Sequence, residues 1–132
     1  MNTVAIRGAI TVENNNSNDI LCNTVELIKE IERRNNINKS QVIAIIFSST
    51  TDLNVEYPAK AARELGYLNT ALMCFILLAG FFAQSFNEMN VVGNLSKCIR
   101  LMMLYNTEIS QDRIKHVYLK GAKILRPDLD IS

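Results

Sequence analysis

Hydrophobic and polar positions in residues 3–12 alternate with a period of two. Such alternation is typical of a strand whose two faces meet different surroundings. The two faces consist of Ala5, Arg7 and Ala9 on one side, and of Val4, Ile6, Ile10 and Val12 on the other. The pattern predicts a first strand that places one arginine among small side chains.

The next apolar positions follow the period of a helix. Ser17 is the expected N-cap, because its hydroxyl can accept a hydrogen bond from a free backbone N–H, and Asp19 suits the first turn. Asn35 and Asn36 supply the expected stop. The apolar stripe of this helix consists of Ile20, Leu21, Thr24, Leu27, Ile28 and Ile31.

Five further elements follow this helix. Residues 42–47 are continuously apolar and β-branched, which predicts a central strand buried on both faces. Pro58 begins a short helix that Gly66 closes. The remaining strands are expected from Tyr67 to about Phe75, at 97–105 and at 116–119.

This order predicts an α+β fold, in which a mixed five-stranded sheet packs on one long helix. The sequence shows neither an internal repeat nor a linker. A chain of 132 residues is long enough for one core, so residues 1–132 are expected to form a single domain.

Residues 65–87 contain no charged side chain. The densest apolar part, ALMCFILLAGFFA, would extend about 20 Å as a helix, against a hydrocarbon core of about 30 Å. A buried strand followed by an apolar hairpin or an interface element is therefore favoured. Attachment to a membrane stays as an alternative.

Composition narrows the function classes. A formal net charge of +1, without tryptophan, provides no field for nucleic acid, so no nucleic-acid partner is expected. Three separated cysteines and one histidine make a metal site a weak interpretation and fit reduced thiols in the cytoplasm. The N-terminus lacks the pattern of a signal peptide.

Three arginines lie in apolar segments: Arg7, Arg100 and Arg126. A guanidinium keeps its proton, so its burial without a counter-ion is costly. The placements therefore suggest a shared anion. That anion is either a ligand carboxylate or a carboxylate of the protein itself.

Four segments resemble the monofunctional AroH-class chorismate mutases: IRGAITVE, YPAKAARELG, MNVVGNLSKCIRLMM and HVYLKGAKILRPDL. They cover nearly the whole chain in order. The resemblance implies an α+β subunit of a homotrimer, with active sites between neighbouring subunits. It also implies an isomerase that converts chorismate to prephenate in the shikimate pathway to phenylalanine and tyrosine, in the cytoplasm and without a cofactor or metal.

The same resemblance implies individual roles. Arg100 would face the breaking ether oxygen and a carboxylate, Arg7 would bind a carboxylate, and Tyr118 would donate a hydrogen bond to a carboxylate. Glu88 would accept from the ring hydroxyl, with Cys74 beside it. The neighbouring subunit would supply Tyr57, Ala59, Lys60 and Arg63, with Leu125 and Arg126 near the mouth. The chain's histidine, His116, is taken as structural.

The chemistry of such a reaction agrees with the residues present. A unimolecular rearrangement of a dicarboxylate needs neither a nucleophile nor a base. A fixed cation at the oxygen that gains negative charge, together with groups that hold the reactive conformer, is sufficient.

One departure from the family pattern concerns Glu88. The family places this acid three positions after the cysteine, whereas Cys74 and Glu88 are fourteen positions apart. We therefore infer an apolar insertion at about residues 76–86. The fold is expected to tolerate it. If the insertion displaces Glu88, the alternative is a non-catalytic relative that binds a dicarboxylate or a protein partner.

Overall fold

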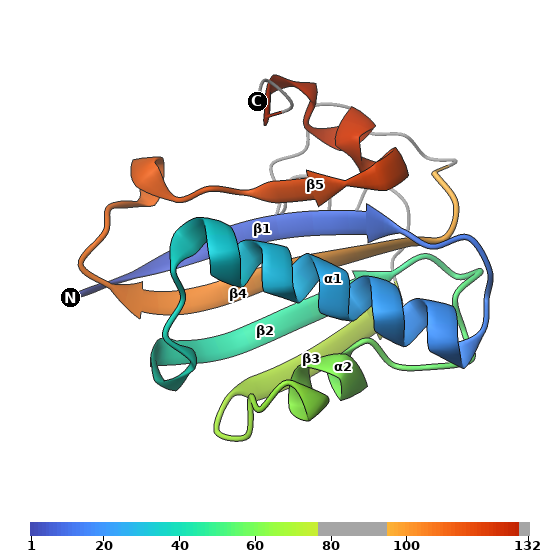
Figure 1. The fold of residues 1–132 in the computed structure, drawn as a ribbon, viewed down its shortest axis with the longest axis horizontal. Coiled ribbons are helices and arrows are strands. Elements are labelled where there is room, and N and C mark those ends of the chain that lie inside the picture. The colour runs from blue at the N-terminus through green and yellow to red at the C-terminus, as the bar shows by residue number, and fades with distance from the viewer. Residues whose placement is uncertain (77–94, 130–132) are drawn as a thin grey trace.

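The computed structural model describes residues 1–76 and 95–129, and their elements follow the predicted order (Figure 1). Short 3₁₀ turns occur at η1 (Lys39–Gln41), η2 (Gln111–Arg113), η3 (Lys120–Leu125) and η4 (Pro127–Leu129). The strands and helices are β1 (Asn2–Thr11), α1 (Ser17–Asn35), β2 (Val42–Ser49), α2 (Ala59–Glu64), β3 (Ala71–Ile76), β4 (Cys98–Thr107) and β5 (Val117–Leu119).

The five strands form one mixed sheet in the order β3-β2-β4-β1-β5. Strand β4 is antiparallel to both β1 and β2, whereas β3 is parallel to β2 and β5 is parallel to β1. Helix α1 lies across one face of the sheet (Figure 1). The α+β class, the mixed sheet and the single long helix are confirmed.

The core lies between α1 and the sheet. Gly8 of β1 allows the close approach on which this packing depends. A Cβ atom at Gly8 would lie 2.7 Å from the carbonyl oxygen of Val117 and 3.2 Å from Leu27 and Ile31. The fully buried residues here include Ile6, Ile10, Ile20, Leu27, Ile28, Ile31, Ile45, Phe47, Ile99, Leu101 and Val117.

The N-cap prediction is wrong by one residue. Asn16 caps α1, because its side chain accepts a hydrogen bond of 2.7 Å from the backbone N–H of Asp19. The Ser17 hydroxyl instead donates to Glu56 at 2.7 Å. The predicted stop is confirmed, since Asn36 takes a left-handed conformation with φ of 53°.

Two strand predictions also need correction. Strand β3 begins at Ala71 rather than at Tyr67, because Tyr67 turns into the core and its hydroxyl donates to Glu32 at 2.5 Å. Strand β2 is not buried on both faces, since Ile43 is exposed. Helix α1 covers only one face of the sheet in the described part of the chain.

Ile76 is the last residue of β3, so the inferred insertion begins in a strand. Its remaining residues, 77–86, and the predicted site residue Glu88 lie outside the described residues. Across residues 1–76 and 95–129, no helix has both the length and the apolar character needed to cross a bilayer.

Candidate active site

A row of residues crosses the sheet on the face opposite α1. Arg100 of β4 lies opposite Ser48 of β2 on one side and opposite Ala9 of β1 on the other. Ala9 in turn lies opposite Tyr118 of β5. Residues paired across strands point to the same face, and the adjacent Leu101 belongs to the core under α1. Arg100 and Tyr118 are therefore separated by the small side chain of Ala9.

Arg7 joins this group from β1, two residues before Ala9 and on the same face. The backbone N–H of Arg7 donates to Nδ1 of His116 at 3.0 Å. The pKa of His116 is lowered to about 4, mainly by burial and to a smaller extent by the charges of Arg7 and Arg126. Both arginines therefore act on one imidazole.

The members of this group differ in burial and partners. Arg100, Tyr118 and Arg126 are 5%, 6% and 8% exposed, whereas Arg7 is half-buried. Arg126 donates to both carboxylate oxygens of Asp128, from Nε at 3.0 Å and from Nη2 at 2.9 Å. This contact lowers the pKa of Asp128. For Arg126, a protein carboxylate is thus one counter-ion.

Leu125 packs behind these cations. It is fully buried in a second apolar cluster on the face away from α1, together with Ala9, Cys98, Tyr118 and Ala122. This cluster supports the ring of Tyr118 from below. Leu125 therefore shapes the site through packing.

A cavity of about 140 Å³ opens at the edge of β5, next to this group. We call it the β5-edge cavity. Its walls carry four basic side chains and one phenol. The lining residues are Arg34, His116, Tyr118, Leu119, Lys123, Arg126 and Leu129.

The other predicted site residues gather around the start of α2. Tyr57 is 73% exposed, and Lys60 and Arg63 are also exposed, while Ala59 is half-buried. Lys60 forms an ion pair of 3.6 Å with Glu56. A second cavity, of about 160 Å³, is lined by Ser49, Leu53, Asn54, Val55, Glu56, Tyr57, Pro58 and Cys74.

We call Arg7, Arg100, Tyr118 and Arg126 the arginine group, and Tyr57, Ala59, Lys60 and Arg63 the α2 group. Cys74 belongs to the α2 group. It pairs with Phe47 of β2, which pairs with Leu101 of β4, so Cys74 points to the face of α1. Burial raises the pKa of the Cys74 thiol, and a hydrogen bond with the backbone of Ala59 partly offsets this effect. The implied position of Cys74 beside the cations is therefore not found within one chain.

The α2 group and Tyr118 lie at opposite edges of the sheet, and Arg100 lies on the central strand β4. Strand β3 forms one edge and β5 the other, with β2, β4 and β1 between them. Four strand spacings amount to about 19 Å. A small dicarboxylate cannot reach from Tyr118 to the α2 group of the same chain.

Sequence reasoning missed two side chains near the cations. His116 was expected to be structural, although it lies two residues before Tyr118 and so shares its face of the strand. No pattern in the sequence pointed to Arg34 of α1, because its place in the wall of the β5-edge cavity depends on where the helix ends relative to β5. The described part of the chain contains no group of three or more His, Cys, Asp or Glu side chains placed to hold a metal ion.

Comparison with known proteins adds an independent line of evidence. Residues 3–129 match the family model described as Chorismate mutase type I. A chorismate mutase AroH from Bacillus subtilis is 40% identical over 128 residues, which cover 96% of this chain and 92% of the relative. A chorismate mutase AroH from Thermus thermophilus is 40% identical over 126 residues, which cover 95% of this chain and 94% of that relative.

A solved structure also resembles this chain. It is a chorismate mutase from Clostridium thermocellum, with a TM-score of 0.78 and 45% sequence identity. The similarity covers 92% of this chain and 98% of the other.

Proposed function

This chain belongs to the chorismate mutase type I family, and we propose that it converts chorismate to prephenate. The observation that carries the proposal is the family match over residues 3–129. Within this range, Arg7, Arg100 and Tyr118 share one face of the sheet. Three distant segments supply this group. They bring two cations and a hydrogen-bond donor to one face, which supports binding of a small dicarboxylate.

Arg100 is the main catalytic residue in this proposal. It lies in β4, which is paired on both sides, and its side chain is buried. The guanidinium is therefore held in place before the substrate arrives, and it stabilises the negative charge that develops on the ether oxygen. The reaction is intramolecular, so stabilising this charge and holding the reactive conformer accelerate it without a base.

Arg7 and Tyr118 would hold the carboxylates of the substrate. Arg7 is half-buried, so its guanidinium can reach a ligand while its backbone stays fixed by His116. Tyr118 lies opposite Ala9, one strand further from Arg100. Arg126 contributes at the mouth, although Asp128 already neutralises part of its charge.

We further propose that the complete site forms between two copies of the chain in a homotrimer. The α2 group of one copy, Tyr57, Ala59, Lys60, Arg63 and Cys74, would cover the arginine group of the next. Their placement on different faces of the sheet supports this arrangement, because a head-to-tail contact brings two different surfaces together. A closed ring of three copies satisfies every such surface.

The pathway and the location follow from the same proposal. Prephenate formation would serve aromatic amino-acid biosynthesis in the cytoplasm. The cysteines Cys22, Cys74 and Cys98 carry thiols, which suits a reducing compartment. Glu88 would accept from the ring hydroxyl of the substrate.

Replacement of Arg100 tests the proposal. Loss of chorismate absorbance is followed for the wild type, Arg100→Ala and the control Arg113→Ala, whose side chain is exposed in η2. We expect Arg100→Ala to lower kcat by about 10²–10³, the usual effect of removing one preorganised donor. Arg113→Ala should match the wild type. Equal rates for Arg100→Ala and the wild type would refute the proposed mechanism.

A further inference from the structure

The β5-edge cavity contains basic side chains that the proposed reaction does not use. Arg34 comes from α1, His116 from the segment before β5, and Lys123 from η3. The cavity volume of about 140 Å³ equals that of a few water molecules at about 30 Å³ each. It can therefore admit a carboxylate group.

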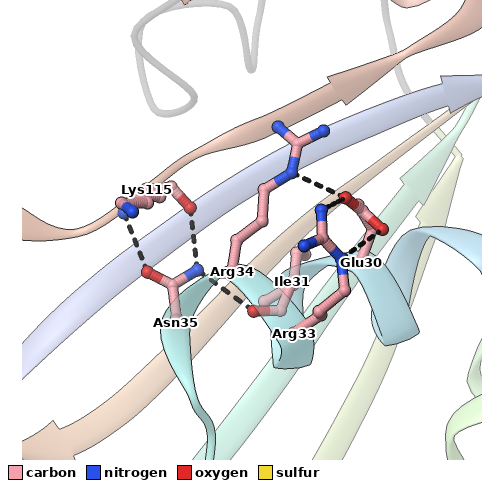
Figure 2. A network of polar contacts seen from close by, with 6 residues as sticks. All are labelled: Glu30, Ile31, Arg33, Arg34, Asn35 and Lys115. Carbon is pink, nitrogen blue, oxygen red and sulfur yellow. Dashed lines mark hydrogen bonds and ion pairs between the residues drawn. The ribbon is translucent and has the colours of Figure 1, made fainter. Parts of the chain in front are cut away.

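Arg34 is oriented by an acidic neighbour. Its Nε donates to Glu30 at 2.7 Å, and Arg33 binds the same carboxylate. Figure 2 shows that the two terminal nitrogens of Arg34 point away from Glu30. Hydrogen bonds from both arginines lower the pKa of Glu30 to about 2, so the carboxylate stays charged and keeps its hold on Arg34.

His116 supplies a donor of a different kind. Its Nδ1 accepts from the backbone of Arg7, so the proton of the neutral ring lies on Nε2. The ring lines the cavity and has no other hydrogen-bond partner within residues 1–76 and 95–129. An uncharged N–H is thus available to a ligand oxygen.

The charges around the cavity favour an anion. Arg34, Lys123 and Arg126 line it, and Arg7 acts on His116 from the side of β1. Asp128 opposes their effect on His116, and it pairs with Arg126. Guanidinium groups bind carboxylate oxygens through paired N–H donors, so a carboxylate is the anion that suits this cavity.

We propose that the β5-edge cavity is an outer carboxylate subsite, where the substrate binds first on its way to Arg100 or where the product pauses as it leaves. The cavity shares Tyr118 and Arg126 with the proposed active site, so an anion held here lies at its entrance. This inference rests on the proposed function for the identity of the ligand. It adds Arg34, His116 and Lys123 as binding residues.

A matched pair of variants tests the subsite through kinetics. Arg34→Gln and Arg33→Gln each remove one partner of Glu30, but only Arg34 lines the cavity. At low ionic strength we expect Arg34→Gln to raise KM about three- to tenfold without changing kcat, since it weakens one partly exposed ionic contact. Added salt should reduce this difference. Identical KM values for the two variants would overturn the subsite.

A second test does not depend on turnover. His116 is the only histidine of the chain, so the Cε1–H proton of its imidazole gives one assignable NMR signal. Titration with sodium succinate, against sodium chloride at equal ionic strength, should shift this signal and raise the pKa of His116, because a bound anion opposes Arg7 and Arg126. Arg34→Gln should weaken the response, and Arg33→Gln should retain it.

The two tests separate the two proposals. A succinate response at His116 in a protein without mutase activity would support the subsite and contradict the proposed function. An active enzyme whose His116 signal responds equally to succinate and chloride would contradict the subsite alone.

Discussion

His116 is a neutral side chain beside a group of cations, and it holds the backbone of one of them. The imidazole replaces a backbone carbonyl as acceptor for the N–H of Arg7, next to the short parallel ladder between β1 and β5. A protonated ring could not accept this hydrogen bond. The fold therefore favours the neutral ring. Protonation of His116 would break this hydrogen bond and so lower the stability of the folded protein.

The first prediction concerns acid stability. Since burial and two arginines lower the pKa of folded His116 from 6.5 to about 4, the unfolded chain binds more protons than the folded one between these values. The free energy of unfolding should therefore fall as the pH falls from 6.5 to 4, by on the order of 3 kcal/mol from this residue. Urea unfolding across this range measures the loss.

His116→Gln is the control for acid stability, because the glutamine amide can accept a hydrogen bond but does not titrate. Its unfolding free energy should depend less on pH within the same window. If both proteins show the same pH dependence there, His116 is not the titrating group.

Ser48 presents a second feature at the scale of single residues. Its hydroxyl is buried opposite Arg100 and has no hydrogen-bond partner in the described part of the chain. A buried polar group without a partner destabilises a fold. Ser48 therefore lowers the stability of β2, the strand that pairs with β4 beside Arg100.

Replacement of Ser48 by alanine should raise the free energy of unfolding by about 1 kcal/mol, because the unpaired hydroxyl is removed. Chemical denaturation measures this change. Ser40→Ala is the control, since that hydroxyl is exposed and donates to Asn38 at 2.8 Å. A loss of stability in Ser48→Ala larger than in Ser40→Ala would contradict the account.

At the scale of elements, Asn35 joins the end of α1 to the segment that leads into β5. Its amide donates to the carbonyl oxygens of Ile31 at 3.1 Å and Lys115 at 2.8 Å, and it accepts from the backbone N–H of Lys115 at 2.8 Å (Figure 2). Strand β5 has only three residues and lies at the edge of the sheet. This clamp therefore helps to hold Tyr118 in position.

Asn35→Ala should lower the free energy of unfolding by about 1–3 kcal/mol, because it leaves backbone groups of Lys115 without their partner. Thermal and urea unfolding measure the change. Asn18→Ala, an exposed substitution on the same helix, should have a much smaller effect. Equal effects would show that the clamp contributes nothing beyond helix propensity.

At the scale of the whole molecule, the proposed assembly would bring the two groups together. The arginine group and the α2 group occupy different faces of one sheet, and Tyr118 and the α2 group lie at its opposite edges. A chain alone can bind the carboxylates of a ligand without enclosing it. Assembly would thus complete the site and exclude water from it.

Mixing inactive variants tests this arrangement. If each site combines two copies, rings mixed from Arg100→Ala and Arg63→Ala chains should regain up to about a quarter of wild-type activity, since some interfaces unite two intact halves. Co-refolding followed by an assay of chorismate loss measures the gain. Arg100→Ala with Arg7→Ala should show none, because both changes lie in the same half.

The sequence by itself determined the elements and the facing of side chains within each of them. Alternation placed Arg7 with Ala9, and helical periodicity identified the buried stripe of α1, because these patterns depend on neighbours a few residues apart. The N-cap at Asn16 and the inward turn of Tyr67 were missed, since several local hydrogen bonds compete there and packing selects among them.

Only the tertiary structure decided which faces meet. The register between strands put Cys74 with the α2 group, and the end of α1 brought Arg34 to His116. It also gave Arg126 a carboxylate of its own chain. Pairing between distant segments fixes these neighbours, and no short-range pattern encodes it.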